Sequence, residues 1–282
     1  MRKGKGFTLI EVLVVIAVIA LLMAILLPVL GRVKRQAKAV VCQSNLHQWG
    51  LWFGMFTDDN DGRFFGWYDY DPGGSDFPSF WMWSMWPYYK KQKDVLLCPM
   101  ASKAPKVRSP RYWMGGVFST WEIGMDTDSS SRRPWDVILP LKGSYGLNNF
   151  VRNEQWEDDL LPIWWSVNPT HWRTPLVKGA DKIPVFLDCA SFELYWPHWN
   201  FPPPDEDTFD HAGPLGMELV SLNRHDGGVN SLFLDWSVRK VGVKEVWKLK
   251  WYPEFDTANE WTIAGGVRPE DWPEWMRGFK DY

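Results

Sequence analysis

The sequence has little cysteine: its 282 residues include only three, at positions 42, 98 and 189. This excludes a disulfide scaffold, because one bridge and one free thiol are the most that the chain can form. Positive charge is not in excess either, since 31 Lys and Arg stand against 34 Asp and Glu. The formal net charge of −3 gives no reason to expect nucleic acid as a partner.

The sequence also lacks the usual signatures of catalysis and of internal repetition. No nucleophile stands beside a recognisable base, no glycine-rich loop is placed to bind phosphate, and no closed metal-ligand motif is present. We therefore expect no enzymatic activity, no catalytic residue, no metal site and no cofactor, with calcium as a minor alternative.

Aromatic residues, by contrast, are abundant, with 21 Trp, 16 Phe and 9 Tyr. They are densest at residues 80–89, 164–165 and 196–199, and two more Trp lie near the end of the chain. Core packing and subunit contacts are favoured, because a loop-rich domain needs large side chains to bury enough area. The alternative is a platform of exposed Trp faces that binds sugar rings or a partner protein.

The N-terminal region holds one long apolar run. From Phe7 to Leu30 there are 24 residues, of which only Glu11 is charged. As a helix the run spans roughly 36 Å, enough to cross a bilayer core of about 30 Å. It is too long for a secretory signal peptide, and no small-x-small cleavage site ends it. An unpaired carboxylate at this depth costs at least about 2.5 kcal/mol, so Glu11 is expected to have a function.

The segment Gly6-Phe7-Thr8-Leu9-Ile10-Glu11 resembles the type III signal of type IV prepilins and type II secretion pseudopilins. The resemblance implies that a prepilin peptidase cleaves between Gly6 and Phe7 and that the new N-terminal Phe7 is N-methylated. It also implies that Glu11 pairs with the N-terminal amine of a neighbouring subunit. Pro28 falls where pilins often carry a proline, and a proline inside a helix removes a backbone hydrogen bond.

The helical pattern continues beyond the apolar run. Apolar residues recur at three- and four-residue steps through residues 31–56, which predicts one amphipathic stripe. We expect a helix from about Thr8 to Phe56, broken or bent near Pro28 and stopped by the turn cluster at residues 57–62. The expected organisation is given by four ranges: a leader (1–6), a membrane and assembly helix (7–30), its amphipathic continuation (31–62) and a globular Trp-rich domain (63–282).

Beyond Gly62 short apolar runs separated by Gly, Pro and Asn predict short strands and long loops. Residues 184–188 are apolar enough for a central strand. Residues 227–241 predict a hairpin that turns at Asp235-Trp236. The expected fold class is α+β, with a long N-terminal helix packed on an antiparallel sheet.

A second resemblance involves the C-terminal part of the chain. His225, nine further residues and then Asp235, together with Gly227 and Gly228, resemble the C-terminal motif of a pseudopilin-like family abundant in planctomycetes and verrucomicrobia. Residues 42–48, 58–62, 97–99 and 144–148 also resemble recurrent pieces of that family. Trp236 stands where the family has glycine, which disfavours a tight turn with positive φ.

Two groups of polar residues are weak candidates for chemistry. His225 and Asp235 would flank a strand about ten residues long, some 30 Å when extended, so a structural role for His225 beside the hairpin is favoured. Thr57, Asp59 and Asp61 are spaced like the start of a calcium loop, but Tyr68 occupies the twelfth position, where a bidentate Glu is needed. A solvated turn is therefore the favoured interpretation. The acidic residues 205–207 form a still weaker site.

The cysteines leave one bridge to consider. Cys42 lies on the predicted helix and Cys98 on a strand-like segment, so a disulfide between them would pin helix to sheet if their Cα atoms come within about 7 Å. Cys189 would then be a small buried residue.

These features and resemblances predict a structural subunit of a type IV pilus-like or type II secretion pseudopilus filament. Its expected partners are prepilin peptidase, other pilin or pseudopilin subunits and the inner membrane, which it would cross once with the C-terminal domain in the periplasm before assembly into a filament. The alternative is a pilin-anchored surface protein whose Trp-rich domain binds polysaccharide. A membrane anchor that never polymerises is disfavoured, because it gains nothing from Glu11.

Overall fold

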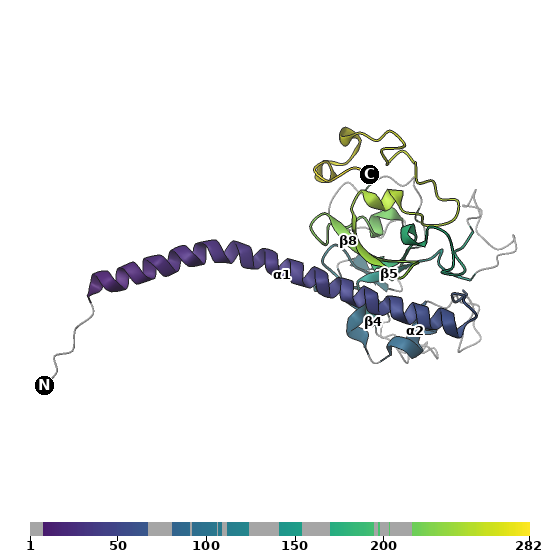
Figure 1. Ribbon diagram of the computed structural model, residues 1–282, viewed down its shortest axis with the longest axis horizontal. Helices are drawn as coiled ribbons and strands as arrows, with labels where there is room; N and C mark the ends of the chain where they lie inside the picture. Colours follow the sequence, from purple (N-terminus) through teal and green to yellow (C-terminus); the bar gives the residue numbers. More distant parts are fainter. Residues whose placement is uncertain are drawn as a thin grey trace.

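The computed structural model describes residues 8–66, 81–90, 92–105, 107–108, 112–123, 141–153, 170–194, 197, 203 and 216–282. A long helix, α1 (Leu9–Asp59), projects from a body built on two β-sheets (Figure 1). The α+β class predicted from the sequence is confirmed.

Helix α1 begins at its N-cap Thr8 and continues without interruption through Pro28. The predicted break at this proline is absent, and the helix is gently bowed instead (Figure 1). A single proline removes one backbone hydrogen bond, and the turns on either side keep theirs. The helix also ends three residues later than predicted, at Asp59, after which Asp61 and Gly62 reverse the chain with positive φ values of 53° and 75°.

The larger sheet has five strands and forms the centre of the body. In spatial order they are β7 (Glu193–Leu194), β5 (Tyr145–Asn148), β6 (Pro184–Asp188), β8 (Gly228–Phe233) and β9 (Val238–Gly242). Neighbours are antiparallel except β5 and β7, which are parallel. The predicted strand at residues 184–188 is β6, in the middle of the sheet, and the predicted hairpin is β8–β9. Both predictions are confirmed.

The β8–β9 turn forms although tryptophan occupies the glycine position. Trp236 has a φ of 66°, in the left-handed region that favours glycine. Its backbone N–H donates to the Phe233 carbonyl at 2.9 Å, and its ring stacks parallel to Phe53 of α1 with 6.5 Å between centroids. Gly54 of α1 lies against the same indole. Packing against α1 therefore compensates for the strained backbone.

The smaller sheet is antiparallel throughout. Its strands, in order, are β1 (Val107–Arg108), β2 (Tyr112–Met114), β3 (Trp121–Ile123) and β4 (Leu141–Gly143). A second helix, α2 (Trp81–Tyr89), forms where only strands and loops were expected. The other helices in the part of the chain that the structure describes are short 3-10 turns: η1 (Lys93–Leu96), η4 (Ala180–Lys182), η5 (Met217–Leu219), η6 (Glu245–Lys248), η7 (Pro269–Asp271) and η8 (Glu274–Met276).

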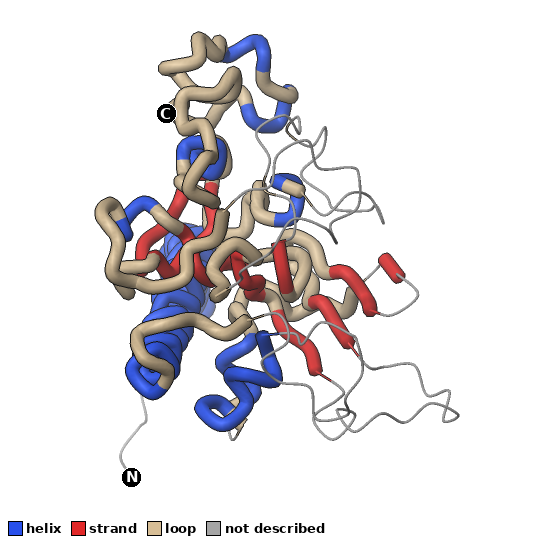
Figure 2. Tube along the Cα trace, turned by 90° about the vertical axis from the view of Figure 1, so that its right-hand side faces the viewer, coloured by secondary structure: helices blue, strands red, loops and turns tan. Residues whose placement is uncertain are grey.

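Two hydrophobic cores cover the two faces of the five-stranded sheet. On one face the second half of α1 and α2 pack against β6, with Trp49, Trp81 and Phe186 in mutual ring contact. On the other face the C-terminal segment, which lies above the sheet in Figures 1 and 2, packs its own aromatic residues. Six tryptophans of the described segments are fully buried: Trp49, Trp81, Trp121, Trp247, Trp251 and Trp272. In the described residues, the aromatic residues thus serve mainly as core.

Candidate functional site

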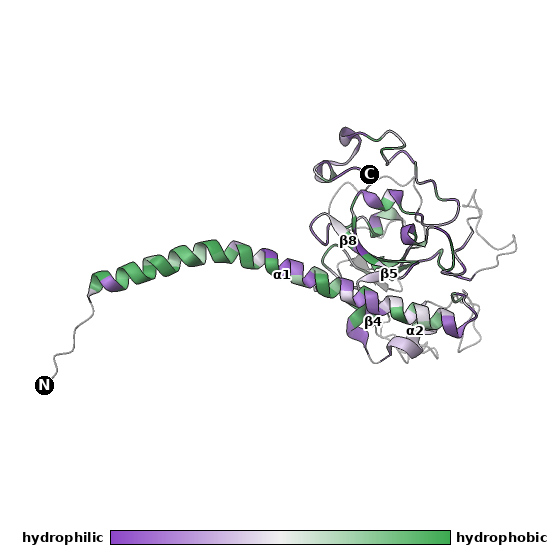
Figure 3. Ribbon diagram, in the orientation of Figure 1, coloured by the Kyte–Doolittle hydropathy of each residue, from purple (hydrophilic) through white to green (hydrophobic). Residues whose placement is uncertain are grey.

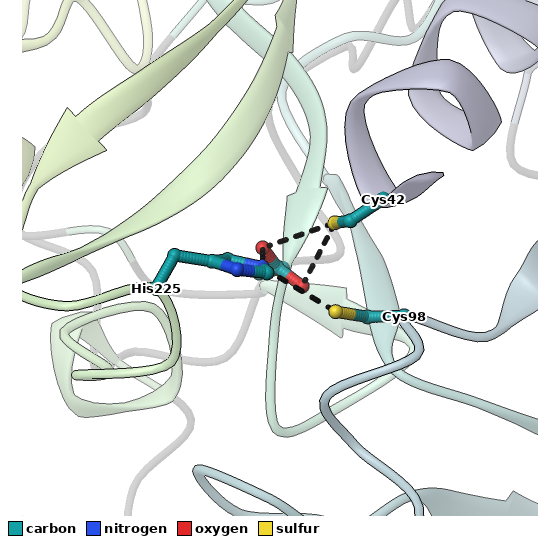
Figure 4. Close-up of side chains that lie close together, drawn as sticks. Cys42, Cys98 and His225 are labelled. Carbon is teal, nitrogen blue, oxygen red and sulfur yellow. Dashed lines mark hydrogen bonds and ion pairs between the residues drawn. The ribbon is translucent and has the colours of Figure 1, made fainter. Parts of the chain in front are cut away.

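Four side chains from separate parts of the chain meet inside the body. Cys42 comes from α1, Cys98 from the loop after η1, Asp188 from the end of β6 and His225 from the loop before β8. All four are buried, and their sulfur, carboxylate and ring-nitrogen atoms lie within 4.8 Å of one another. Figure 4 shows Cys42, Cys98 and His225 pointing toward a common centre.

The shortest contacts of this cluster run through Asp188 and His225. The His225 Nε2 atom lies 3.0 Å from Asp188 Oδ2 and 3.3 Å from the Cys98 sulfur. The Cys42 sulfur lies 3.6 Å from the same carboxylate oxygen. Each of the four side chains is therefore in direct contact with at least one of the others.

Local structure fixes each of these side chains in place. Cys42 is the first buried residue of α1, at the point where the helix enters the body. Asp188 ends a strand with no exposed residue, and its Oδ2 accepts a hydrogen bond from the Asn230 amide of β8 at 2.8 Å. The Cys98 amide donates to the Ser144 hydroxyl at 2.6 Å. The His225 amide donates to the Gly228 carbonyl at 2.9 Å, which closes a tight loop.

A fully buried arginine, Arg224, contacts the cluster through Asp188. Arg224 Nη1 donates to Asp188 Oδ1 at 2.8 Å and to the Ser144 carbonyl at 2.7 Å. Its Nε and Nη2 donate to the carbonyls of Val117 and Gly116, in the connection between β2 and β3. A buried guanidinium with every nitrogen bonded is a rigid cross-link between the two sheets.

Electrostatics shifts the pKa values of Asp188, His225 and Cys98. Burial opposes a charged Asp188, but Arg224 and His225 outweigh it and hold the pKa of that carboxyl well below its usual range. Burial also lowers the pKa of His225, but the Asp188 charge dominates and raises it to about 9. Burial raises the pKa of Cys98, yet hydrogen bonds from Cys42 and His225 and the charge of Arg224 bring it down to about 6.

The second candidate site is the first half of α1, which protrudes from the body. From Leu9 to Val41 no residue is buried, and the apolar colour in Figure 3 runs round the whole helix up to the basic residues near position 32. Among the described residues, α1 is the one helix that is long and apolar enough to cross a membrane. An uncovered apolar surface of this extent needs lipid or protein around it.

The single carboxylate of that surface is bonded to its own helix start. Thr8 donates to Glu11 Oε2 from its amide at 2.8 Å and from its hydroxyl at 2.7 Å, and the Glu11 amide donates back to the Thr8 hydroxyl at 3.3 Å. This reciprocal capping box satisfies Glu11 within one isolated chain. Gly6 and Phe7, the predicted cleavage site, lie outside the described residues.

Comparisons with known proteins agree with the N-terminal pattern. Residues 1–27 match the family described as the prokaryotic N-terminal methylation motif. The type IV wide pilus major component PilA4 of Thermus thermophilus is 43% identical over 61 residues, which is 22% of this chain and 47% of the relative. The N-terminal segment of this chain is type IV pilin-like. The chain thus spans about half the length of that pilin. No solved structure matches the present chain.

The two ends of the predicted C-terminal motif, His225 and Asp235, lie apart in the structure. His225 precedes β8 and Asp235 follows it, so the two residues lie at opposite ends of the strand, as expected. The Asp235 carboxylate accepts a hydrogen bond from the Ser237 hydroxyl at 2.6 Å within the β8–β9 turn. Gly227 has a φ of 92°, and a Cβ on Gly228 would collide with the Val241 carbonyl. The motif residues therefore shape the hairpin, and the comparisons do not extend to them.

Cys42 and Cys98, the pair considered for a disulfide, lie close together, and all three cysteines are free thiols. Cys98 follows a 3-10 helix rather than lying on a strand, which corrects the sequence interpretation. Cys189 is fully buried, as expected.

The residues spaced like the start of a calcium loop belong partly to the helix. Thr57 and Asp59 form the last turn of α1, where the Thr57 hydroxyl donates to the Gly54 carbonyl and Asp59 accepts from the Tyr88 hydroxyl at 2.8 Å. Tyr68, the Trp residues at 164–165, 196 and 199, and the acidic residues 205–207 lie outside the described residues.

Sequence reasoning missed one member of the buried cluster, Asp188, and the arginine that pairs with it, Arg224. Asp188 was visible only as the polar end of an apolar strand, and Arg224 only as the neighbour of His225. The available signal was the charged Asp188 at the end of an otherwise apolar strand, because a charged residue enters the core only with a partner.

Proposed function

We propose that this chain is a structural subunit of a type IV pilus-like or type II secretion pseudopilus filament, and not an enzyme. The observation that carries the proposal is the exposed apolar half of α1 with one carboxylate near its start, joined to the prepilin-type motif at residues 1–27. Such a surface is stable in a bilayer or against copies of itself.

In this proposal the unprocessed chain resides in the inner membrane as a single-pass protein with its body in the periplasm. Prepilin peptidase removes residues 1–6 and leaves an N-methylated Phe7. Glu11 then exchanges its bonds to Thr8 for the N-terminal amine of a neighbouring subunit. A repeated contact of this head-to-tail kind does not close on itself, so the subunits form a helical filament with their helices at its centre.

The body is best explained as the outer layer of that filament. Eight tryptophans of the described residues are buried. Six of them are fully buried, and Trp52 and Trp83 keep a small exposed fraction. Buried rings cannot stack on sugars. The burial of these tryptophans, among the residues that the structure describes, supports a packed spacer over a polysaccharide-binding platform.

Processing can be tested by intact mass and N-terminal analysis of the chain co-expressed with a prepilin peptidase. The expected product begins at methylated Phe7. Gly6→Leu should abolish cleavage, whereas Gly4→Leu, in the same leader, should leave it unchanged. An uncut chain beginning at Met1 beside an active peptidase would contradict the proposal.

A further inference from the structure

The buried cluster contains the four donor types that suit one tetrahedral metal ion. Zinc bonds of about 2.0–2.3 Å to sulfur, nitrogen and oxygen place neighbouring donors roughly 3.3 to 3.8 Å apart. The measured contacts of 3.0 Å, 3.3 Å and 3.6 Å lie at or near this range, and no pair exceeds 4.8 Å. We propose that Cys42, Cys98, Asp188 and His225 form a structural site for a divalent ion of the zinc type.

The groups around the cluster support its use as a metal site. Arg224 and the Asn230 amide orient the Asp188 carboxylate, and the Tyr145 hydroxyl donates to the Cys42 sulfur at 3.2 Å. Outer hydrogen bonds of this kind position metal ligands. Two thiolates and one carboxylate carry three negative charges, which a divalent ion and the Arg224 guanidinium balance. The loaded site is therefore neutral, as burial requires.

One ligand of the cluster, His225, also lines a surface cavity. A cavity of about 460 Å³ lies between α1 and the β8–β9 hairpin, and His225, Arg224 and Asn230 contribute to its lining. Gln43 and Lys240 line it from α1 and β9.

The position of the site indicates what the ion would do. Cys42 is the first buried residue of α1, and the three other ligands belong to the body. A bound ion would clamp the helix to the sheet where the helix emerges. A Cys42–Cys98 disulfide would link the same two segments, but it would leave the convergence of Asp188 and His225 on the sulfurs unexplained. The metal site is independent of the filament function.

The test uses the full chain, purified in detergent under reducing conditions, with Zn²⁺ and Co²⁺ as probes. We expect about one equivalent of bound zinc per chain by elemental analysis, and thiolate-to-cobalt charge-transfer absorption with tetrahedral d–d bands after cobalt loading. Cys42→Ser and Cys98→Ser should each reduce bound zinc to less than about a tenth of an equivalent. Cys189→Ser is the matched control, because this third buried cysteine is outside the cluster, and it should bind as the unsubstituted chain does.

Wild-type cobalt spectra keep the test valid even if a ligand variant fails to fold. The proposal is overturned if the reduced wild-type chain binds no zinc or cobalt. It is also overturned if binding persists in Cys42→Ser, or if mass spectrometry of protein from the periplasm shows a Cys42–Cys98 disulfide and no metal.

Discussion

At the scale of single residues, the most heavily bonded side chain around the cluster is Arg224. It is fully buried, pairs with Asp188 and donates to three backbone carbonyls from two loops. Its removal would take the guanidinium partner from the buried Asp188 carboxylate, leaving it His225 and the Asn230 backbone amide, and would take one donor from each of three carbonyls. Each lost hydrogen bond is unfavourable in a dry interior.

We therefore expect Arg224→Met to lower the free energy of unfolding by about 3–5 kcal/mol, the typical loss when one partner of a buried ion pair is removed. Urea unfolding of the detergent-solubilised chain, followed by tryptophan fluorescence, measures this change. Arg239→Met is the control. Arg239 pairs with Glu245 at 2.7 Å but is 40% exposed, so its loss should be about 1 kcal/mol or less. Equal losses in the two variants would contradict the central role of Arg224.

At the scale of elements, α1 has two halves with different surroundings. Its first half has no buried residue, and its second half contributes Trp49 and Phe53 to the core of the body. Trp49 contacts rings of α2 and β6 and donates from its indole nitrogen to the Val95 carbonyl at 2.9 Å. The helix is therefore attached to the body along one face of its second half.

Trp49→Ala should remove about 3–5 kcal/mol of stability, because it leaves a large cavity at the centre of this attachment. Leu51→Ala is a matched control on the same helix, since Leu51 is 70% exposed, and it should change stability by no more than about 0.5 kcal/mol. The urea midpoints of the two variants test the difference. A tolerated Trp49→Ala would mean that the helix is held elsewhere.

At the scale of the whole molecule, the exposed apolar surface and the packed body lie in different parts of the chain. We expect the full chain to fractionate with membranes and to be released by detergent. Residues 31–282, which keep every buried residue of α1, should form a soluble monomer, because the apolar run is gone and both cores are intact.

Size-exclusion chromatography and urea unfolding of the two forms measure this prediction. The urea midpoint of residues 31–282 should match that of the full chain in detergent, since residues 9–30 contribute no buried contact. An aggregated fragment, or a clearly lower midpoint, would show that the apolar segment stabilises the body.

The sequence by itself determined the features that depend on neighbouring residues. The apolar run, the central strand at 184–188 and the β8–β9 hairpin all follow from local composition and spacing. Composition at residues 81–89 was ambiguous, because a dense aromatic run carries no clear period. That segment became α2 by packing against α1.

Only the tertiary structure decided the buried cluster. Cys42 and Asp188 are 146 residues apart, and Cys98 and His225 are 127 apart, so no local spacing signals that they meet. Their meeting depends on the register of β6 against β8 and on the position of α1 across the sheet. Both are set by non-local burial of apolar surface, which sequence periodicity indicates for each element but does not assign to partners.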